Sequence, residues 1–98
     1  MYKIKIYKAA QRDLTALVDY LNTLSPKAAI KYYDIIIEKI GGLAEMPERH
    51  PLLRDAQLRL RGYRVLLIDK YMVFFVVKGD TVQIRRILYN RRQYEGML

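Results

Sequence analysis

Residues 71–89 read YMVFFVVKGDTVQIRRILY, and this stretch decides the fold. Residues 71–77 are apolar at almost every position, which is typical of a strand that is buried on both faces. Residues 78–80, Lys-Gly-Asp, have the chemistry of a turn, and residues 82–89 are typical of the next strand. Residues 63–68 also have a strand pattern, and the two residues Asp69-Lys70 connect them to the strand at 71–77. We therefore predict a three-stranded antiparallel meander.

The first half of the chain predicts one strand and two helices. Residues 2–7 alternate between apolar and other side chains, as in a half-buried strand. Residues 9–24 have apolar side chains at helical spacing, and Ser25-Pro26 provides a cap and a proline start for a second helix that ends before Pro47. Residues 47–60 are interpreted as a loop with room for one short edge strand. The predicted fold is α+β, in the order β-α-α-β-β-β, with a helical hairpin packed on a small, mainly antiparallel, twisted sheet.

Length and composition limit the class of protein. The 98 residues predict a single domain over 1–98. No apolar run approaches the roughly 18 residues of a membrane span, and the N-terminus has no signal-peptide pattern, so we expect a cytoplasmic protein without a membrane partner. The absence of cysteine excludes disulfides, thiolate metal sites and cysteine nucleophiles.

Positive charge is concentrated in the second half of the chain. The net charge is +8. Residues 1–48 contain seven Lys/Arg against six Asp/Glu, whereas residues 49–98 contain eleven against four, including nine of the ten arginines. Solubility alone is one explanation. The segregation of arginine, whose planar fork suits phosphate, favours a polyanionic partner.

Most familiar catalytic groups are missing from the sequence. His50 is the only histidine and Ser25 the only serine, so neither a histidine metal site nor a Ser-His-Asp triad can form. The glycines match no nucleotide-binding motif. We expect no metal and no cofactor.

Arginine and tyrosine remain as candidates for chemistry. If the basic side chains of the later strands converge on one sheet face, they could position the phosphates of RNA, whose 2′-hydroxyl supplies the nucleophile, while tyrosines stack on bases. For Tyr63 and Tyr71, the alternative to contacting RNA is that they are core residues. Arg85 and Arg86 are neighbours that point to opposite faces, so at least one is expected to have a structural partner. Arg91 and Arg92 lie beyond the last strand, where the alternative to a functional role is that they are simply exposed to solvent.

The chain resembles the RelE/ParE superfamily of bacterial type II toxin–antitoxin toxins over nearly its full length. The resemblance is carried by the following stretches: Ala10-Gln11-Arg12-Asp13-Leu14, Ser25-Pro26-Lys27-Ala28-Ala29, Pro51-Leu52, Arg61-Gly62-Tyr63-Arg64, residues 71–77, Gly79-Asp80-Thr81-Val82 and residues 84–92. It implies a toxin that a cognate antitoxin neutralises. RelE-like members cleave mRNA on the ribosome, whereas ParE-like members bind and poison DNA gyrase.

Carried over residue by residue, the RelE pattern gives a partial match. It implies catalytic roles for Arg64, Arg92 and either Tyr89 or Tyr94. Flanking arginines would bind RNA or another polyanion: Arg59, Arg61, Arg85 and Arg91. Leu66 and Met72 stand where nuclease members have basic residues, and the ending 87–92 is closer to ParE-like chains, which usually have histidine where Tyr89 stands.

Three hypotheses follow from the resemblance. The first is a ribosome-dependent mRNA interferase, which the charge slightly favours. The second is a gyrase inhibitor that is not an enzyme. The third is a non-toxic corepressor that meets operator DNA only through its antitoxin. All three predict exposed apolar patches that an amphipathic, acidic antitoxin segment covers.

Overall fold

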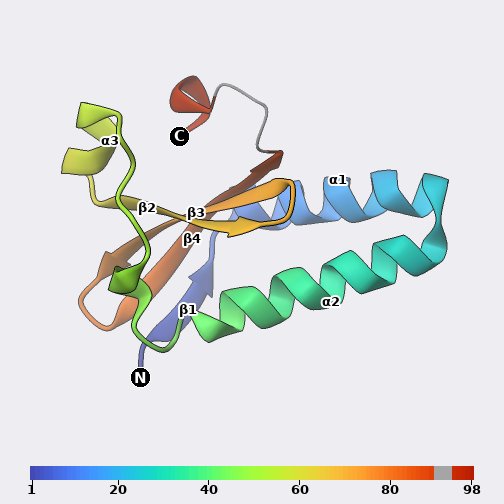
Figure 1. The fold of residues 1–98 in the computed structure, drawn as a ribbon, viewed down its shortest axis with the longest axis horizontal. Coiled ribbons are helices and arrows are strands. Elements are labelled where there is room, and N and C mark those ends of the chain that lie inside the picture. Colours follow the sequence, from blue (N-terminus) through green and yellow to red (C-terminus); the bar gives the residue numbers. More distant parts are fainter. Residues whose placement is uncertain (90–93) are drawn as a thin grey trace.

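A four-stranded sheet in the order β1-β4-β3-β2 forms the centre of the molecule (Figure 1). The computed structural model describes residues 1–89 and 94–98. The strands are β1 (Lys3–Ile6), β2 (Tyr63–Ile68), β3 (Tyr71–Lys78) and β4 (Thr81–Tyr89). β2, β3 and β4 form the predicted antiparallel meander, and β1 pairs in parallel with β4. The prediction of an α+β fold with this element order is confirmed.

Two long helices form a hairpin on one face of the sheet. They are α1 (Lys8–Leu24) and α2 (Pro26–Gly42). Ser25 Oγ accepts a hydrogen bond from the Ala28 backbone N–H at 3.3 Å, so the predicted cap is present. Figure 1 shows the hairpin extending well past the strands, so its tip has no sheet beneath it.

The central strand β3 is buried on both faces, as its apolar sequence predicts. Val73 and Phe75 face the helices, whereas Phe74 and Val76 face the opposite side, and none of the four is more than 2% exposed. The core on the helix side is made by apolar residues of both helices and all of the strands. The second, smaller core lies on the other face, and its buried members are Leu53, Leu58, Tyr63, Phe74, Val76 and Leu88.

The cover of the second face corrects the interpretation of residues 47–60 as a loop. This segment contains the single 3-10 turn η1 (Pro47–Arg49) and the short helix α3 (Ala56–Leu60). Asp55 Oδ1 caps α3 by accepting from the Leu58 backbone N–H at 3.0 Å, and Leu58 is buried below it. The expected edge strand is reduced to one bridge between Leu52 and Arg64. α3 was missed because five residues are too few to show a helical period.

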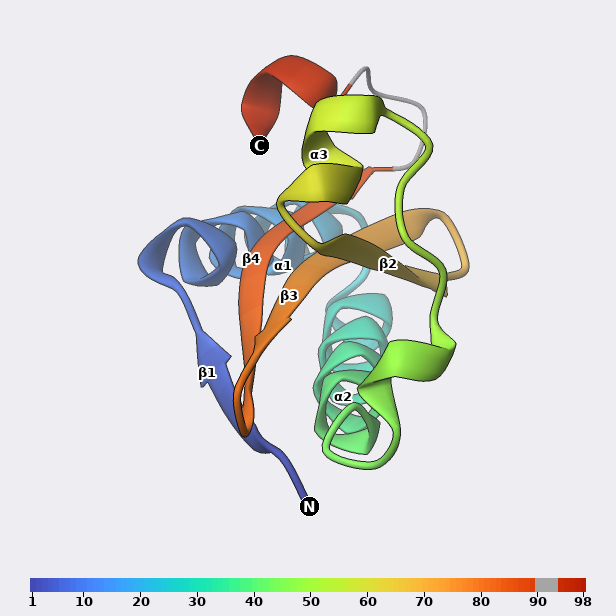
Figure 2. The ribbon, with the colours of Figure 1, turned by 90° about the vertical axis from the view of Figure 1, so that its left-hand side faces the viewer.

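The C-terminal turn η2 (Glu95–Met97) lies on the same side of the sheet as α3 (Figure 2). Tyr94, Met97 and Leu98 pack against the second core. Within residues 1–89 and 94–98, none of the helices combines the length and the apolar character that crossing a bilayer requires.

Candidate functional site

Arg64, a predicted catalytic residue, is held against the backbone of the preceding loop. Its Nη1 donates to Glu48 O at 3.0 Å and to His50 O at 2.7 Å. The His50 ring in turn lies edge-on to Phe75 with ring centres 5.9 Å apart. Burial lowers the pKa of His50, and the positive charges of Arg49 and Arg64 lower it further. Arg64 therefore fastens η1 and the loop to β2.

Arg85, a predicted polyanion-binding residue, lies on the other face of the sheet. Its guanidinium sits between the rings of Tyr7 and Tyr63, at 4.8 and 5.5 Å from their centres. Tyr63 belongs to the second core, whereas Arg64 pairs with Phe75 of the helix-side core. The expectation that the basic groups of these strands converge on one sheet face is wrong for Arg64 and Arg85, because successive residues of β2 point to opposite faces.

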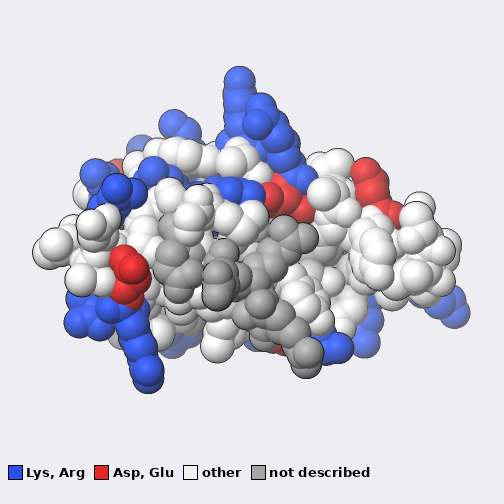
Figure 3. Space-filling view, turned by 90° about the horizontal axis from the view of Figure 1, so that it is seen from above, with Lys and Arg blue, Asp and Glu red and all other residues white. Residues whose placement is uncertain are grey.

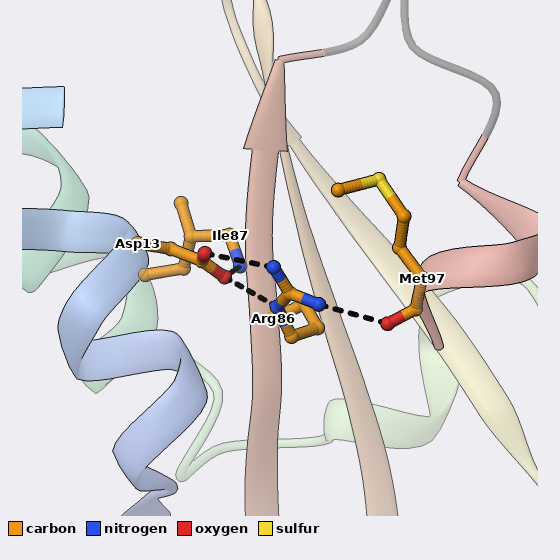
Figure 4. A network of polar contacts seen from close by, with 4 residues as sticks. All are labelled: Asp13, Arg86, Ile87 and Met97. Atoms are coloured by element: carbon orange, nitrogen blue, oxygen red, sulfur yellow. Dashed lines mark hydrogen bonds and ion pairs between the residues drawn. The ribbon is translucent and has the colours of Figure 1, made fainter. Parts of the chain in front are cut away.

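Arg86 links three elements of the fold (Figure 4). Its Nε and Nη2 donate to Asp13 Oδ2 and Oδ1 of α1 at 2.7 and 2.9 Å, and its Nη1 donates to Met97 O at 2.8 Å. The Ile87 backbone N–H also donates to Asp13 Oδ2, at 3.0 Å. The hydrogen bonds to Asp13 raise the pKa of Arg86 further above its ordinary value. The prediction that Arg85 or Arg86 has a structural partner is confirmed. The prediction that the two point to opposite faces is wrong, because a β-bulge places both between Ile84 and Ile87 of the helix-side core, and both reach the second face.

The two candidate tyrosines have different surroundings. The Tyr94 ring packs on Phe74 with centres 4.8 Å apart, as part of the second core. Tyr89 is 36% exposed and meets the Tyr71 ring edge-on at 5.8 Å. Burial raises the pKa of Tyr71, which is half-buried. Tyr63 is 3% exposed, so its alternative interpretation as a core residue is confirmed.

A cavity of about 440 Å³ lies between α1 and the C-terminal half of β4. The Asp13–Arg86 pair lines it together with Tyr20, Tyr71 and Tyr89. Tyr89 is the only one of the predicted catalytic residues within the described ranges 1–89 and 94–98 that reaches this cavity.

The remaining predicted arginines divide into two groups. Arg59 and Arg61 are exposed at the end of α3, and Arg59 Nε donates to Leu53 O at 3.0 Å. Arg91 and Arg92 lie outside the described residues. Seen from above, Lys and Arg gather at the left-hand end and along the upper rim, whereas the right-hand end with the hairpin tip is largely white (Figure 3).

Two features around the predicted site were missed by the sequence analysis. Asp13 is 73 residues away from Arg86 in the chain, and no local pattern connects them. Lys3 and Lys5 belong to the half of the chain whose charges nearly balance, yet β1 pairs directly with β4. The sequence does show that Lys3 and Lys5 alternate with apolar residues and so share one face of the strand. It does not show which strand β1 pairs with, and that pairing is needed to place the two lysines.

Comparison with known proteins places this geometry in a family. A family model described as the ParE toxin of the type II toxin–antitoxin system parDE matches residues 4–94. The chain belongs to the ParE toxin family. No curated protein matches it in a sequence search.

Two solved structures share the ParE-family fold seen here. One, from a chromosomal ParDE toxin–antitoxin system of P. aeruginosa, is 27% identical and has a TM-score of 0.76, with 91% of this chain and 96% of that chain covered. The other is the solution structure of a conserved hypothetical protein from Helicobacter pylori, 19% identical with a TM-score of 0.56, with 94% and 98% covered. The second likeness concerns the fold alone.

The helical hairpin of this ParE-family chain carries the apolar patches that the sequence predicts. A groove of about 350 Å³ between α1 and α2 is lined by Ile6, Leu14, Val18, Tyr33 and Ile37, together with the polar Gln11, Thr15 and Asp19. Further large apolar side chains stand exposed on the two helices, among them Tyr20, Leu24 and Ile30, each more than 60% exposed. An exposed apolar surface of this kind marks a binding face.

Proposed function

We propose that this chain is the toxin of a type II toxin–antitoxin module and acts by binding and poisoning DNA gyrase, not by cleaving RNA. The observation that carries the proposal is the state of Arg64. Its Nη1 is committed to two backbone carbonyls, and it lies on the opposite sheet face from Arg85. A phosphate-cleaving site needs donors that converge on one developing charge.

The positions around Arg64 support the same proposal. Leu66 is buried in the helix-side core, and Met72 packs against the second core. The Tyr94 ring packs on Phe74. Apolar packing at these positions is compatible with a protein that acts through a binding surface. Among the described residues expected to serve RNA cleavage, Arg64 and Tyr94 therefore both make structural contacts.

We also propose a cognate antitoxin as the partner that covers the hairpin groove. An amphipathic helix binds a groove through apolar side chains at helical spacing, and acidic residues elsewhere on the antitoxin would meet the arginines of the second half of the chain. The α2 wall of this groove is formed by Tyr33 and Ile37, whereas α1 contributes Leu14 and Val18 together with the polar Gln11, Thr15 and Asp19.

Ribosome-dependent mRNA cleavage remains the second candidate, because one observation favours it. Tyr89 is exposed at the rim of a cavity that also contains Arg86, and exposed Arg59 and Arg61 add positive charge at the α3 end. Such an arrangement could hold RNA.

The decisive experiment compares the two targets with the same purified toxin. We expect the toxin to inhibit supercoiling by gyrase, the antitoxin to restore it, and toeprints on translating ribosomes to show no new cuts in the A site. A-site cuts with unchanged supercoiling would establish the nuclease instead. Normal growth on induction without antitoxin, together with neither activity in vitro, would favour the corepressor hypothesis.

A further inference from the structure

Four cations form a patch on the sheet face opposite the helical hairpin. The patch consists of Lys3 and Lys5 of β1, Lys78 of β3 and Arg85 of β4, and is called the β1 basic patch below. The register places Lys5 beside Gln83, and Gln83 beside Val76 of the second core, so Lys5 points to the second face. Thr81 lies two residues before Gln83 on β4 and therefore points to the same face. Lys3 and Lys78 both pair with Thr81, so they share that face as well.

No described element covers this patch. α3 and the C-terminal turn lie over the other end of the sheet, while β1 stands clear of both (Figure 2). All three lysines are exposed. Within the described part of the chain, the one ion pair found in the patch joins Lys3 Nζ to Asp80 Oδ2 at 3.8 Å, with both side chains more than 70% exposed. Such a pair is weak, so the patch keeps a net positive charge.

Arg85 gives the patch a fixed point. Its guanidinium is clamped between Tyr7 and Tyr63, and its Nη1 donates to Gln83 Oε1 at 3.2 Å. Lys5 Nζ lies over the Tyr7 ring as well, 5.4 Å from its centre. A clamped arginine loses little conformational freedom when it binds an anion.

The same contacts decide which anion fits. Proteins that grip single strands need tyrosine faces on which bases stack. Here the Tyr7 ring faces Arg85 and Lys5, and Tyr63 is buried. Cations remain available for phosphates while these two rings are not available for bases, which is the requirement for sequence-independent contact with a duplex backbone.

We infer that the β1 basic patch binds the phosphate backbone of duplex DNA without reading its sequence. The choice of DNA over duplex RNA rests on the proposed function, because gyrase acts on duplex DNA and a toxin bound to it would meet that DNA. The patch would add DNA contacts to the toxin–gyrase complex, and the hairpin would remain free for protein partners.

Fluorescence anisotropy with a labelled DNA duplex tests the inference on the isolated toxin, without gyrase. The double variant Lys5→Glu/Lys78→Glu reverses two exposed charges of the patch. Lys31→Glu/Lys39→Glu on α2 changes the net charge by the same amount away from the patch and serves as the matched control. We expect the patch variant to lose affinity at least about tenfold and to reduce the slope of log K against log salt by about 1.8, the value for two phosphate contacts, while the control keeps the wild-type slope.

Circular dichroism and thermal unfolding check that both variants remain folded. If both variants lost DNA affinity equally, the loss would be explained by net charge alone, and the inference would be overturned. Tighter binding of single strands or of duplex RNA, or equal binding of poly-glutamate, would overturn it too. Failure to bind DNA with gyrase still inhibited would remove this inference alone, whereas DNA binding with unaffected gyrase would remove the proposed function alone.

Discussion

Asp13 Oδ2 accepts two hydrogen bonds at the open edge of β4, one from Arg86 Nε at 2.7 Å and one from the Ile87 backbone N–H at 3.0 Å. β1 ends at Ile6, and the Tyr7 N–H makes the final backbone bond to β4, at Ile84 O. Beyond this point, none of the strands in the described part of the chain borders this edge of β4. The carboxylate of Asp13, from the second turn of α1, therefore supplies the acceptor that a longer β1 would have provided.

Replacing Asp13 with asparagine should lower the free energy of unfolding by about 2–3 kcal/mol. The substitution leaves Arg86, with only 23% of its side chain exposed, without its charged partner, and it weakens the bond to Ile87. Urea denaturation measures the change. Asp19→Asn, on an exposed position of the same helix, is the control and should change stability by less than about 0.5 kcal/mol. Equal effects of the two variants would show that the Asp13–Arg86 pair is not structural.

Arg64 is expected to stabilise the fold more than to serve chemistry. Arg64→Gln removes the two charge-assisted bonds to Glu48 O and His50 O and should cost about 1–2 kcal/mol of unfolding free energy. Arg61→Gln, at an exposed position, should have almost no effect and provides the control. Growth arrest should persist in the Arg64 variant at a temperature where it is fully folded. Loss of arrest in a folded Arg64→Gln protein would contradict the structural role and support catalysis.

His50 should make stability depend on pH. Its pKa is lowered in the folded state, first by burial and then by Arg49 and Arg64, so the unfolded chain binds the proton more readily. The stability contributed by neutral His50 is therefore fully present above the unfolded pKa of about 6.5 and is lost as the pH falls through the lower folded value. The denaturation midpoint should fall more steeply for the wild type than for His50→Gln as the pH is lowered from about 8 to about 5. Parallel curves for the two proteins would rule out this origin.

Much of the fold follows from the sequence because its signals are local. The alternation of β1, the Ser25-Pro26 helix start and the apolar run of β3 each specify one element without reference to the rest of the chain. The strand order is not local. Nothing in the residues of β1 states that it will pair with β4, and this pairing is what brings Lys3 and Lys5 to the face that carries Arg85.

The candidate site was less predictable, because it depends on register. A β-bulge shifts the pairing of β3 and β4, so that Phe74 pairs with Arg86 and Phe75 with Ile84, which leaves Arg85 as the extra residue. A shift of one residue decides which face receives a side chain. Counting arginines by chain segment could show that charge was concentrated, but it could not show that Arg64 and Arg85 point to opposite sides.

Removing only the hydroxyl group of Tyr94 distinguishes a structural role from a catalytic one. Its ring contacts Phe74 in the second core, and this contact does not use the hydroxyl group. Tyr94→Phe should therefore keep both stability and growth arrest, whereas Tyr94→Ala should lower the free energy of unfolding by about 1–3 kcal/mol through lost packing. A catalytic tyrosine would behave in the opposite way, since Tyr94→Phe would abolish arrest at unchanged stability. Thermal unfolding and induction of each variant without antitoxin give both readouts, and loss of arrest in the folded Tyr94→Phe protein would return RNA cleavage to first place.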